Sequence, residues 1–274
     1  MVGAVALVML AGCSDSKSSS PPTGSSANTS SEAASASAPP ARALRILVSN
    51  DDGVAAPGID ALVNALIAEP DVTVTVVAPA ENQSGSGGST TPGTLAASSA
   101  TTASGYAATA VKGFPADAVI YGLTTVLKER PDVVITGTNA GQNIGPAIDV
   151  SGTIGAARAA AQRGIPALAV SAGFGDPIDF ATPTREAVKW LRDHRTALLA
   201  SPPPPASVDN INAPTCPTGQ VRGLVNVTPE PSATLADALA DPDCTSTAPA
   251  PPGDVAAFHV GFATLETVPI RPSS

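Results

Sequence analysis

Short apolar runs alternate with amphipathic segments through the middle of this chain. The runs at residues 46–48, 72–78, 133–135 and 166–171 predict buried β-strands. Residues 57–68 start at Pro57 and Gly58 and place apolar residues on one face, which is typical of an amphipathic helix. Further helices are predicted over residues 115–127, 151–162 and 183–200. This alternation predicts an α/β fold, a three-layer, mostly parallel and doubly wound sheet.

Two segments do not follow this pattern. Residues 80–104 are rich in Ser, Gly and Thr and predict a long loop or a weak hairpin, followed by a strand over residues 106–111. Beyond Ser201 the chain becomes rich in proline, with candidate strands at residues 208–212, 221–228 and 256–267. We therefore expect residues 201–274 to form a C-terminal β-rich extension of the main sheet.

The first 42 residues have the composition of an export signal followed by a tether. Residues 1–12 are apolar but too short to span a bilayer as a helix, and they fit the apolar region of a secretory signal. The Leu-Ala-Gly-Cys sequence that ends at Cys13 resembles a bacterial lipobox, which implies cleavage before Cys13 and lipidation of its thiol. The alternative is a plain secretory signal with an incidental cysteine. Either interpretation predicts an exported protein.

Residues 13–42 consist mainly of Ser, Ala, Pro and Gly and have almost nothing to bury, so we expect a disordered linker. With an acylated Cys13, this linker would hold a globular domain at residues 43–274 near a membrane that faces the periplasm or the cell exterior. The other two cysteines, Cys216 and Cys244, most simply form a disulfide in an oxidising compartment. Closing this loop of roughly 30 residues would stabilise the fold by about 3 to 4 kcal/mol. The alternative is two free thiols.

Charge narrows the partners that the chain can bind. The formal net charge is −9, which argues against nucleic-acid polymers because phosphate backbones need neutralisation by Lys and Arg. A small phosphorylated ligand is compatible with this charge, because a metal ion and backbone amides can neutralise it locally.

The candidate chemistry begins at the end of the first predicted strand, where Asp51 and Asp52 precede Gly53. Two adjacent carboxylates at the exit of a buried strand are costly to leave unpaired, because burial and mutual repulsion raise the pKa of each. A bound cation would remove that cost, so the pair predicts a metal site. The alternative is an ordinary Asp-Asp-Gly turn.

Other polar loops follow later strands and should meet at the same edge of a parallel sheet. They contain Ser84, residues 137–145, and the helix start at Ser151, Gly152 and Thr153. Their oxygen-rich side chains suit Mg²⁺, Mn²⁺ or Ca²⁺. Free amides at the helix start suit a phosphate, although Ser151 alone can equally be an N-cap.

Four separated motifs carry a family resemblance: ILVSNDDGVAAPGI at residues 46–59, VVAPAENQSG at 76–85, GFPADAV at 113–119, and the segment at 131–170 that contains GTNAGQNIG and SGT. They resemble the SurE family of survival-protein phosphatases and nucleotidases, in the family's order, over residues 44–171. The resemblance implies the family's α/β fold. It also implies a divalent-metal-dependent phosphomonoesterase that hydrolyses nucleoside 5′-monophosphates, or 3′-monophosphates, by attack of a metal-activated water.

The resemblance also implies roles for individual residues. It assigns the catalytic role to Asp51 and Asp52, and it assigns one divalent metal ion, Mg²⁺, Mn²⁺ or Ca²⁺, to a ligand set of Asp51, Asp52, Ser84 and Asn139. Phosphate or substrate binding is assigned to Asn143, Ser151, Gly152 and Thr153. The chain departs from the family pattern at Ala55, at Pro146-Ala147 and at Val150. These departures bear on substrate preference more than on the metal.

Two further expectations concern partners and alternatives. The family often forms homodimers through a swapped carboxyl-terminal segment, so a homodimer is one expectation, although this chain's own end is short and rich in proline. The alternative to an enzyme is a surface lipoprotein that binds a nucleotide or phosphate without turning it over. A purely structural anchored protein would bind no metal at all.

Overall fold

A computed structural model describes residues 42–272 of the chain. The predicted signal peptide, the lipidation site at Cys13 and the linker lie outside these residues. The described residues form a nine-stranded sheet in the order β3-β4-β2-β1-β5-β6-β7-β9-β8. Within this part of the chain, no helix is both long enough and apolar enough to cross a bilayer.

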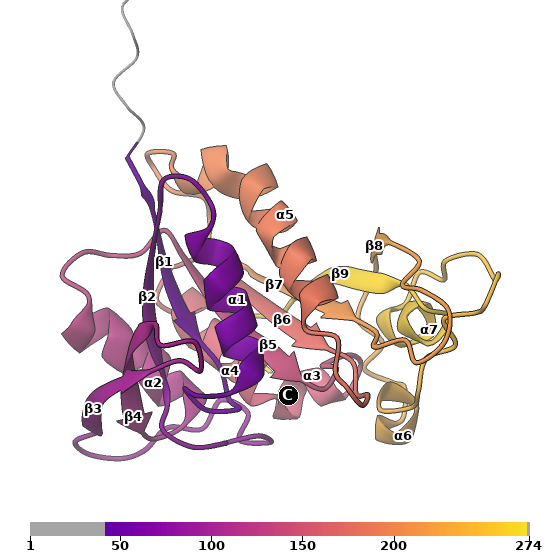
Figure 1. The fold of residues 1–274 in the computed structure, drawn as a ribbon, viewed down its shortest axis with the longest axis horizontal. Coiled ribbons are helices and arrows are strands. Elements are labelled where there is room, and N and C mark those ends of the chain that lie inside the picture. The colour runs from indigo at the N-terminus through magenta and orange to yellow at the C-terminus, as the bar shows by residue number, and fades with distance from the viewer. Residues whose placement is uncertain (1–41, 273–274) are drawn as a thin grey trace, which may run out of the picture. The chain divides into compact units, whose positions relative to one another are not determined.

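The chain alternates strands and helices through most of its length (Figure 1). The strands are β1 (Leu44–Ser49), β2 (Val72–Pro79), β3 (Ala96–Thr101), β4 (Ala107–Lys112), β5 (Val133–Ala140), β6 (Ala167–Ala172), β7 (Val208–Ala213), β8 (Leu224–Asn226) and β9 (Ala263–Val268). The helices are α1 (Pro57–Ile67), α2 (Pro115–Tyr121), α3 (Ala147–Val150), α4 (Gly152–Ala161), α5 (Ala181–Leu198), α6 (Leu235–Ala238) and α7 (Asp254–His259), with a π-helical turn η1 (Gly122–Val126) after α2.

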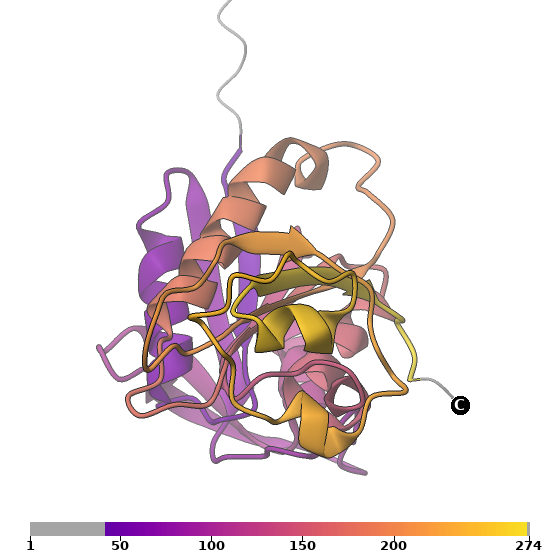
Figure 2. The ribbon, with the colours of Figure 1, turned by 90° about the vertical axis from the view of Figure 1, so that its right-hand side faces the viewer.

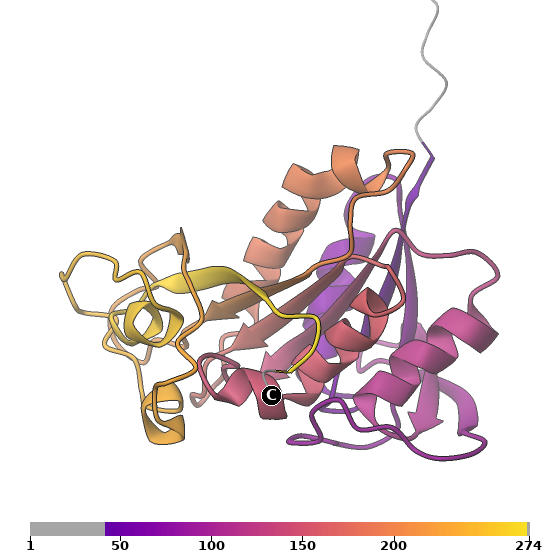
Figure 3. The same cartoon turned by 180° about the vertical axis from the view of Figure 1, so that it is seen from behind.

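Helices cover both faces of the sheet and form two hydrophobic cores. Strand β1 shows how, because Ile46 and Val48 pack with α1 and α5 whereas Leu47 packs with α2 and α4. Figure 1 shows α1 and α5 in front of the sheet, and Figure 3 shows the opposite face with α2 and α4. The pairs β1–β2, β1–β5, β2–β4, β5–β6 and β6–β7 are all parallel. The predicted three-layer, doubly wound α/β fold is confirmed.

The Ser- and Gly-rich segment after β2 contains both a loop and one strand of a hairpin. Residues 80–95 have no regular structure, and β3 then pairs antiparallel with β4. Strand β3 is largely exposed along its length, which explains why its sequence lacks the apolar residues that normally identify a strand.

Strand β5 is longer than its apolar sequence predicts. Only residues 133–135 were expected to be strand, but β5 continues through the polar residues as far as Ala140. These polar side chains are buried with specific partners: Thr136 Oγ1, for example, donates to the Thr153 carbonyl at 2.9 Å. A buried strand can therefore carry polar residues when the fold supplies their hydrogen bonds.

The C-terminal extension is only partly the β structure that we expected. Strand β7 lies parallel to β6, and β9 pairs antiparallel with β7 and parallel with β8. The predicted strand over residues 256–267 is wrong in its first half, because α7 occupies Asp254–His259 and only β9 is strand. Phe258 of α7 packs with Ile144 and Val255 in a third small core. Figure 2 shows α6, α7 and β8 grouped at this end of the sheet.

A disulfide joins two loops of this extension. Cys216 and Cys244 are bonded with their Cα atoms 5.8 Å apart. The bond ties the segment that follows β7 to the segment that precedes α7.

Candidate active site

The candidate site lies where the winding of the sheet reverses. After β1 the chain places β2, β3 and β4 on one side of β1, and it then returns to place β5 on the other side. In doubly wound sheets the crevice beyond the carboxyl ends of two such strands is the usual ligand site. Asp51 and Asp52 follow β1, and Asn139 lies near the end of β5. Three residues of the predicted ligand set therefore lie at this switch point.

Asp51 lies at the amino end of α4. Its side chain is only 3% exposed, and Thr153 Oγ1 donates to Asp51 Oδ1 at 2.6 Å. Gly152 makes this close approach possible, since a Cβ atom there would lie 2.8 Å from Asp51 Oδ2. The positive end of the helix dipole also stabilises a carboxylate at this position.

Burial makes both aspartates reluctant to ionise. It is the largest cause that raises the pKa of Asp51 to about 6; the neighbouring charge of Asp52 adds to this, and the Thr153 hydrogen bond opposes it. Burial likewise raises the pKa of Asp52, against a hydrogen bond from the Ala140 amide. Among the described residues, none of the ion pairs involves either carboxylate. A cation would supply the missing opposite charge.

Asp52 links the first loop to β5. The Ala140 amide donates to Asp52 Oδ2 at 3.1 Å, directly after Asn139 in the chain. Asn139 is buried, and its Nδ2 donates to the Gly141 carbonyl at 2.6 Å. This bond uses the donor end of the Asn139 side chain, so its carbonyl oxygen is the atom left to coordinate a cation.

The loop that carries Ser84 touches the site through its backbone. The Gln83 amide donates to the Asp51 carbonyl at 2.7 Å, and the Gly87 amide donates to the Val150 carbonyl at 3.1 Å. Gly155 of α4 lets this loop approach, because a Cβ atom there would lie 1.9 Å from the Gly87 carbonyl oxygen. Ser84 itself is exposed beside these contacts.

Ser86 is a site residue that the sequence did not single out. Its hydroxyl is buried without a protein partner, and it lies 3.0 Å from the position that a Cβ atom at Gly152 would occupy. That same position is 2.8 Å from Asp51 Oδ2, so Ser86 faces the region between Asp51 and the start of α4. A serine in a Ser- and Gly-rich loop carries no local signal that identifies it.

Asn143 is held firmly behind the site. Its backbone N–H donates to Asn212 Oδ1 at 2.7 Å, and its backbone carbonyl accepts from Asn210 Nδ2 at 2.8 Å. Its side-chain Nδ2 donates to Ser171 Oγ at 2.9 Å. Asp254 of α7 holds the same loop through the Gly145 amide at 2.6 Å. The C-terminal extension therefore fixes the loop that was predicted to bind substrate.

The helix start at 151–153 has structural roles as well as the predicted one. Ser151 Oγ accepts from the Ile154 amide at 3.1 Å, so Ser151 is an N-cap, as the alternative interpretation held. The Thr153 hydroxyl is fully buried and donates its hydrogen bond to Asp51 Oδ1. Phosphate binding by Asn143, Ser151, Gly152 and Thr153 stays a prediction, for which amides at the start of α4 are the suitable donors.

The residues present fit a hard divalent cation. The ligand set offers two carboxylates, a carboxamide oxygen and a hydroxyl, a donor chemistry that suits Mg²⁺, Mn²⁺ or Ca²⁺. The Ser86 hydroxyl and Asn50 Oδ1 are buried without a protein partner. Ser86 lies close to Asp51 in space, and Asn50 directly precedes Asp51 in the sequence. In residues 42–272 no group of three or more His, Cys, Asp or Glu side chains is suited to hold a metal, so carboxylates alone do not complete this site.

Comparison with known proteins identifies the family. The model of the survival protein SurE family matches residues 46–234. The chain belongs to the SurE family. It is 39% identical to the 5′-nucleotidase SurE of Gloeobacter violaceus over 183 residues, which are 66% of this chain and 68% of that protein. It is 38% identical to the 5′/3′-nucleotidase SurE of Yersinia enterocolitica over 181 residues, which are 66% of this chain and 68% of that protein.

The fold agrees with this family. The crystal structure of the SurE protein from Aquifex aeolicus matches with a TM-score of 0.65 and 26% sequence identity, and it covers 84% of this chain and 94% of that one. The resemblance to the SurE family is confirmed, and it extends past residue 171 to residue 234. Of the departures from the family pattern, Ala55 and Val150 are exposed, whereas Ala147 is buried.

Proposed function

We propose that this SurE-family chain is a phosphomonoesterase that hydrolyses nucleoside 5′-monophosphates and depends on a divalent metal ion. Relatives named 5′-nucleotidase and 5′/3′-nucleotidase support the substrate class and leave 3′-monophosphates as a second substrate. The observation that carries the metal is the adjacent pair of Asp51, which is buried, and Asp52, which is half-buried. Both carboxyl groups have a raised pKa, and in the described residues neither has a cationic partner in an ion pair.

In the proposed mechanism, a divalent ion and the residues of the chain have separate roles. Asp51, Asp52, Ser84 and Asn139 would hold a divalent ion, which would supply Lewis-acid chemistry toward the phosphate and a water nucleophile. Thr153 holds Asp51 in place with a 2.6 Å hydrogen bond, and the Ala140 amide holds Asp52. The first amides of α4 face the same crevice and suit the negative charge of the phosphate.

The experiment is a phosphate-release assay on the purified full chain. We expect release of phosphate from AMP or GMP with Mn²⁺ or Mg²⁺, loss of activity with EDTA, and recovery when the metal is added back. Asp51→Asn should lower kcat by about a hundredfold or more, because oriented electrostatic groups contribute rate factors of this order. Absence of metal-dependent release across nucleotides and simple phosphate esters would refute the enzyme.

A binding protein without turnover is the alternative outcome of the same experiment. It is motivated by Ala55 and by Pro146-Ala147, which replace residues usual in the family pattern. Calorimetry would then show metal-dependent AMP binding by a chain that releases no phosphate.

Export and membrane anchoring are also part of the proposal. They rest on the lipobox-like sequence at Cys13 and on the composition of residues 14–42. Incorporation of labelled fatty acid into the wild-type chain, and its loss in Cys13→Ser, would test the anchor. The proposed homodimer is tested by the mass of the purified protein in solution.

A further inference from the structure

A cavity of about 620 Å³ lies beside α4, on the face of the sheet that α2 and α4 cover (Figure 3). Its walls come from α2, from α4 and the turn after it, and from residues 88–90 of the loop that follows β2. The candidate active site meets α4 at Gly152, whereas Arg158 lines the cavity. Six residues of helix separate these two positions, a rise of about 9 Å, so the cavity is distinct from the crevice at Asp51 and Asp52.

The charged residues that line this cavity are all basic. Arg158 and Arg163 line it, and no Asp or Glu is among its lining residues. The formal net charge of the chain is −9, so the lining of this cavity has the opposite sign to the chain as a whole. A concave surface lined by one sign of charge concentrates ions of the other sign. The cavity is therefore suited to an anion.

Arg158 is fixed in place and still has donor groups left for a ligand. Its side chain is only 4% exposed. Its Nε donates to the Pro269 carbonyl at 2.9 Å, and its Nη2 donates to Asp149 Oδ1 at 2.7 Å. Within residues 42–272 its Nη1 makes no hydrogen bond, and the side chain lines the cavity. A guanidinium that is ordered before the ligand arrives loses little conformational entropy on binding.

Arg163 and two hydroxyl groups complete the donor set. Arg163 is exposed just beyond α4, and its Nη1 donates to the Ala159 carbonyl at 2.9 Å. It belongs to none of the ion pairs among the described residues, so no carboxylate balances its charge. Ser89 and Thr90 line the cavity and are exposed. Guanidinium and hydroxyl groups together are typical donors to phosphate oxygens.

The cavity shares a loop with the candidate active site. This loop carries Ser84 of the predicted ligand set, and its residues 88–90 line the cavity. The Ser89 amide donates to the Ser86 carbonyl at 3.1 Å, so the two parts of the loop are bonded to each other. A ligand that joins residues 88–90 to α4 therefore restrains the segment that carries Ser84.

We propose that this cavity is a regulatory site for a small organic phosphate, separate from the site of hydrolysis. Arg158 and Arg163 bind the phosphate oxygens, and the apolar walls at Ala116 and Ile120 contact the organic part. The bound ligand restrains the loop that carries Ser84, so less conformational entropy is lost when the metal ion binds. Binding at the cavity is independent of the proposed function, whereas its effect on the metal rests on it.

The binding test is calorimetry on the full chain in EDTA. The probes are phenylphosphonate, which has no ester bond to hydrolyse, and inorganic phosphate. Without a metal ion, the carboxylates at the candidate active site repel both anions. Arg163→Ala removes one donor of the cavity, and Arg185→Ala is the matched control, because Arg185 is also exposed and lies at the start of α5. Thermal unfolding verifies that each variant is folded.

We expect the wild type and Arg185→Ala to bind phenylphosphonate with equal affinity, and Arg163→Ala to bind it at least fivefold more weakly. Inorganic phosphate should bind more weakly than phenylphosphonate, because it makes no contact with the apolar walls. No binding by the wild type, or equal binding by the wild type and Arg163→Ala, would overturn the site. Equal affinities for the two probes would assign the cavity to free phosphate and overturn the organic ligand.

The regulatory effect is measured by titration with Mn²⁺ in the presence and absence of phenylphosphonate. Phenylphosphonate also reaches the metal site, so the comparison between variants decides the result. It should raise Mn²⁺ affinity at least threefold more in the wild type and in Arg185→Ala than in Arg163→Ala. The same increase in all three chains would overturn the coupling between the cavity and the metal.

The regulatory site and the enzymatic function fail in different ways. A wild-type chain that hydrolyses no phosphate ester refutes the proposed function, and the titration in EDTA then decides the cavity by itself. A chain that hydrolyses phosphate esters but binds neither probe in EDTA keeps the function and overturns the regulatory site.

Discussion

Asp51 combines burial, a neighbouring carboxylate and a long-range hydrogen bond in one residue of the candidate site. It is buried, it lies next to a second carboxylate, and it accepts a hydrogen bond from Thr153, a residue far away in the sequence. The Thr153 hydroxyl therefore positions a carboxylate of the proposed metal site from the start of α4. Removing this donor would leave a buried acceptor without its partner, which costs more than the bond itself contributes.

Thr153→Val keeps the shape of the side chain and removes the donor. We expect a loss of about 1 to 3 kcal/mol in the free energy of unfolding, as for other buried groups left without a partner. Urea denaturation in EDTA measures this loss, and calorimetry with Mn²⁺ should show weaker binding because Asp51 is less well oriented.

Thr264→Val is the matched control. Thr264 is also fully buried, but its hydroxyl has no protein partner. Its replacement should be neutral or slightly stabilising and should leave Mn²⁺ affinity as in the wild type. Similar losses in the two variants would contradict a specific role for the Thr153 hydrogen bond.

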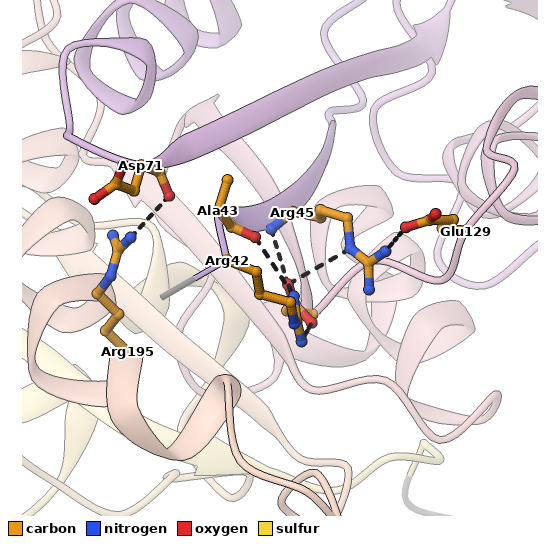
Figure 4. A network of polar contacts seen from close by, with 7 residues as sticks. Arg42, Ala43, Arg45, Asp71, Glu129 and Arg195 are labelled. Atoms are coloured by element: carbon orange, nitrogen blue, oxygen red, sulfur yellow. Dashed lines mark hydrogen bonds and ion pairs between the residues drawn. The ribbon is translucent and has the colours of Figure 1, made fainter. Parts of the chain in front are cut away.

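Strand β1 is fixed at its amino end by a polar network that includes Arg42 and Arg45 (Figure 4). Both residues donate hydrogen bonds to the Asp132 carboxylate. Both terminal nitrogens of Arg42 donate to Asp132 at 2.7 Å, and the Arg45 amide donates to the same carboxylate at 2.8 Å. Nearby, Arg195 of α5 donates to the Asp71 carbonyl at the start of β2. The central strand is therefore tied to its neighbours at the end opposite to the candidate site.

Asp132→Asn tests this network at the scale of the element. Burial alone would raise the pKa of Asp132, but hydrogen bonds from Arg42 and Arg45 hold it below its ordinary value. We expect a loss of about 1 to 3 kcal/mol at pH 7, because charge-assisted hydrogen bonds to a partly buried carboxylate are removed. Thermal unfolding measures the loss.

Asp193→Asn is the control for this variant. Asp193 is exposed and pairs with Lys189 four residues earlier on α5. Exposed pairs of this kind contribute little to stability because water and salt screen them, so the control should remain close to the wild type. A loss as large as that of Asp132→Asn would show that charge alone, and not the bidentate network, determines stability.

The whole molecule joins a doubly wound sheet to an extension that supports the site from behind. Strand β9 carries Glu266, whose Oε1 accepts from Asn210 Nδ2 at 2.8 Å, and Asn210 in turn holds the Asn143 carbonyl. Burial is the main cause that raises the pKa of Glu266 to about 8, and the charge of Asp254 adds to it. Glu266 therefore couples the stability of the extension to pH.

The pH dependence of unfolding should show this coupling. Because the folded pKa of about 8 lies above the ordinary value of 4.5, folded Glu266 holds a proton that the unfolded chain has released. Its contribution lowers the free energy of unfolding as pH rises from about 4.5 to about 8, by up to ~1.4 kcal/mol per pH unit.

Glu266→Gln should flatten this slope and be more stable than the wild type at pH 9. Chemical denaturation at several pH values measures both effects. Glu81→Gln, at an exposed position, is the control and should keep the wild-type slope. A Glu266→Gln variant with an unchanged slope would mean that Glu266 is ionised in the folded protein.

The sequence by itself determined the class of fold and the strand ends at which the site forms. Apolar runs predicted β1, β2 and β6 because these strands are buried on both faces, and the Asp-Asp-Gly turn after β1 marked the carboxylate pair. The polar half of β5 and helix α7 were missed, because their form depends on partners that a local pattern does not contain.

Only the tertiary structure decided which of these groups meet. The bond between Thr153 and Asp51 spans 102 positions, and the contacts that hold Asn143 come from Asn210 and Asn212 nearly 70 positions away. Ser86 and the cavity beside α4 likewise depend on segments that are far apart in the sequence. Spacing along a chain records periodicity within one element, whereas the geometry of a site depends on how the sheet reverses its winding and brings strand ends together.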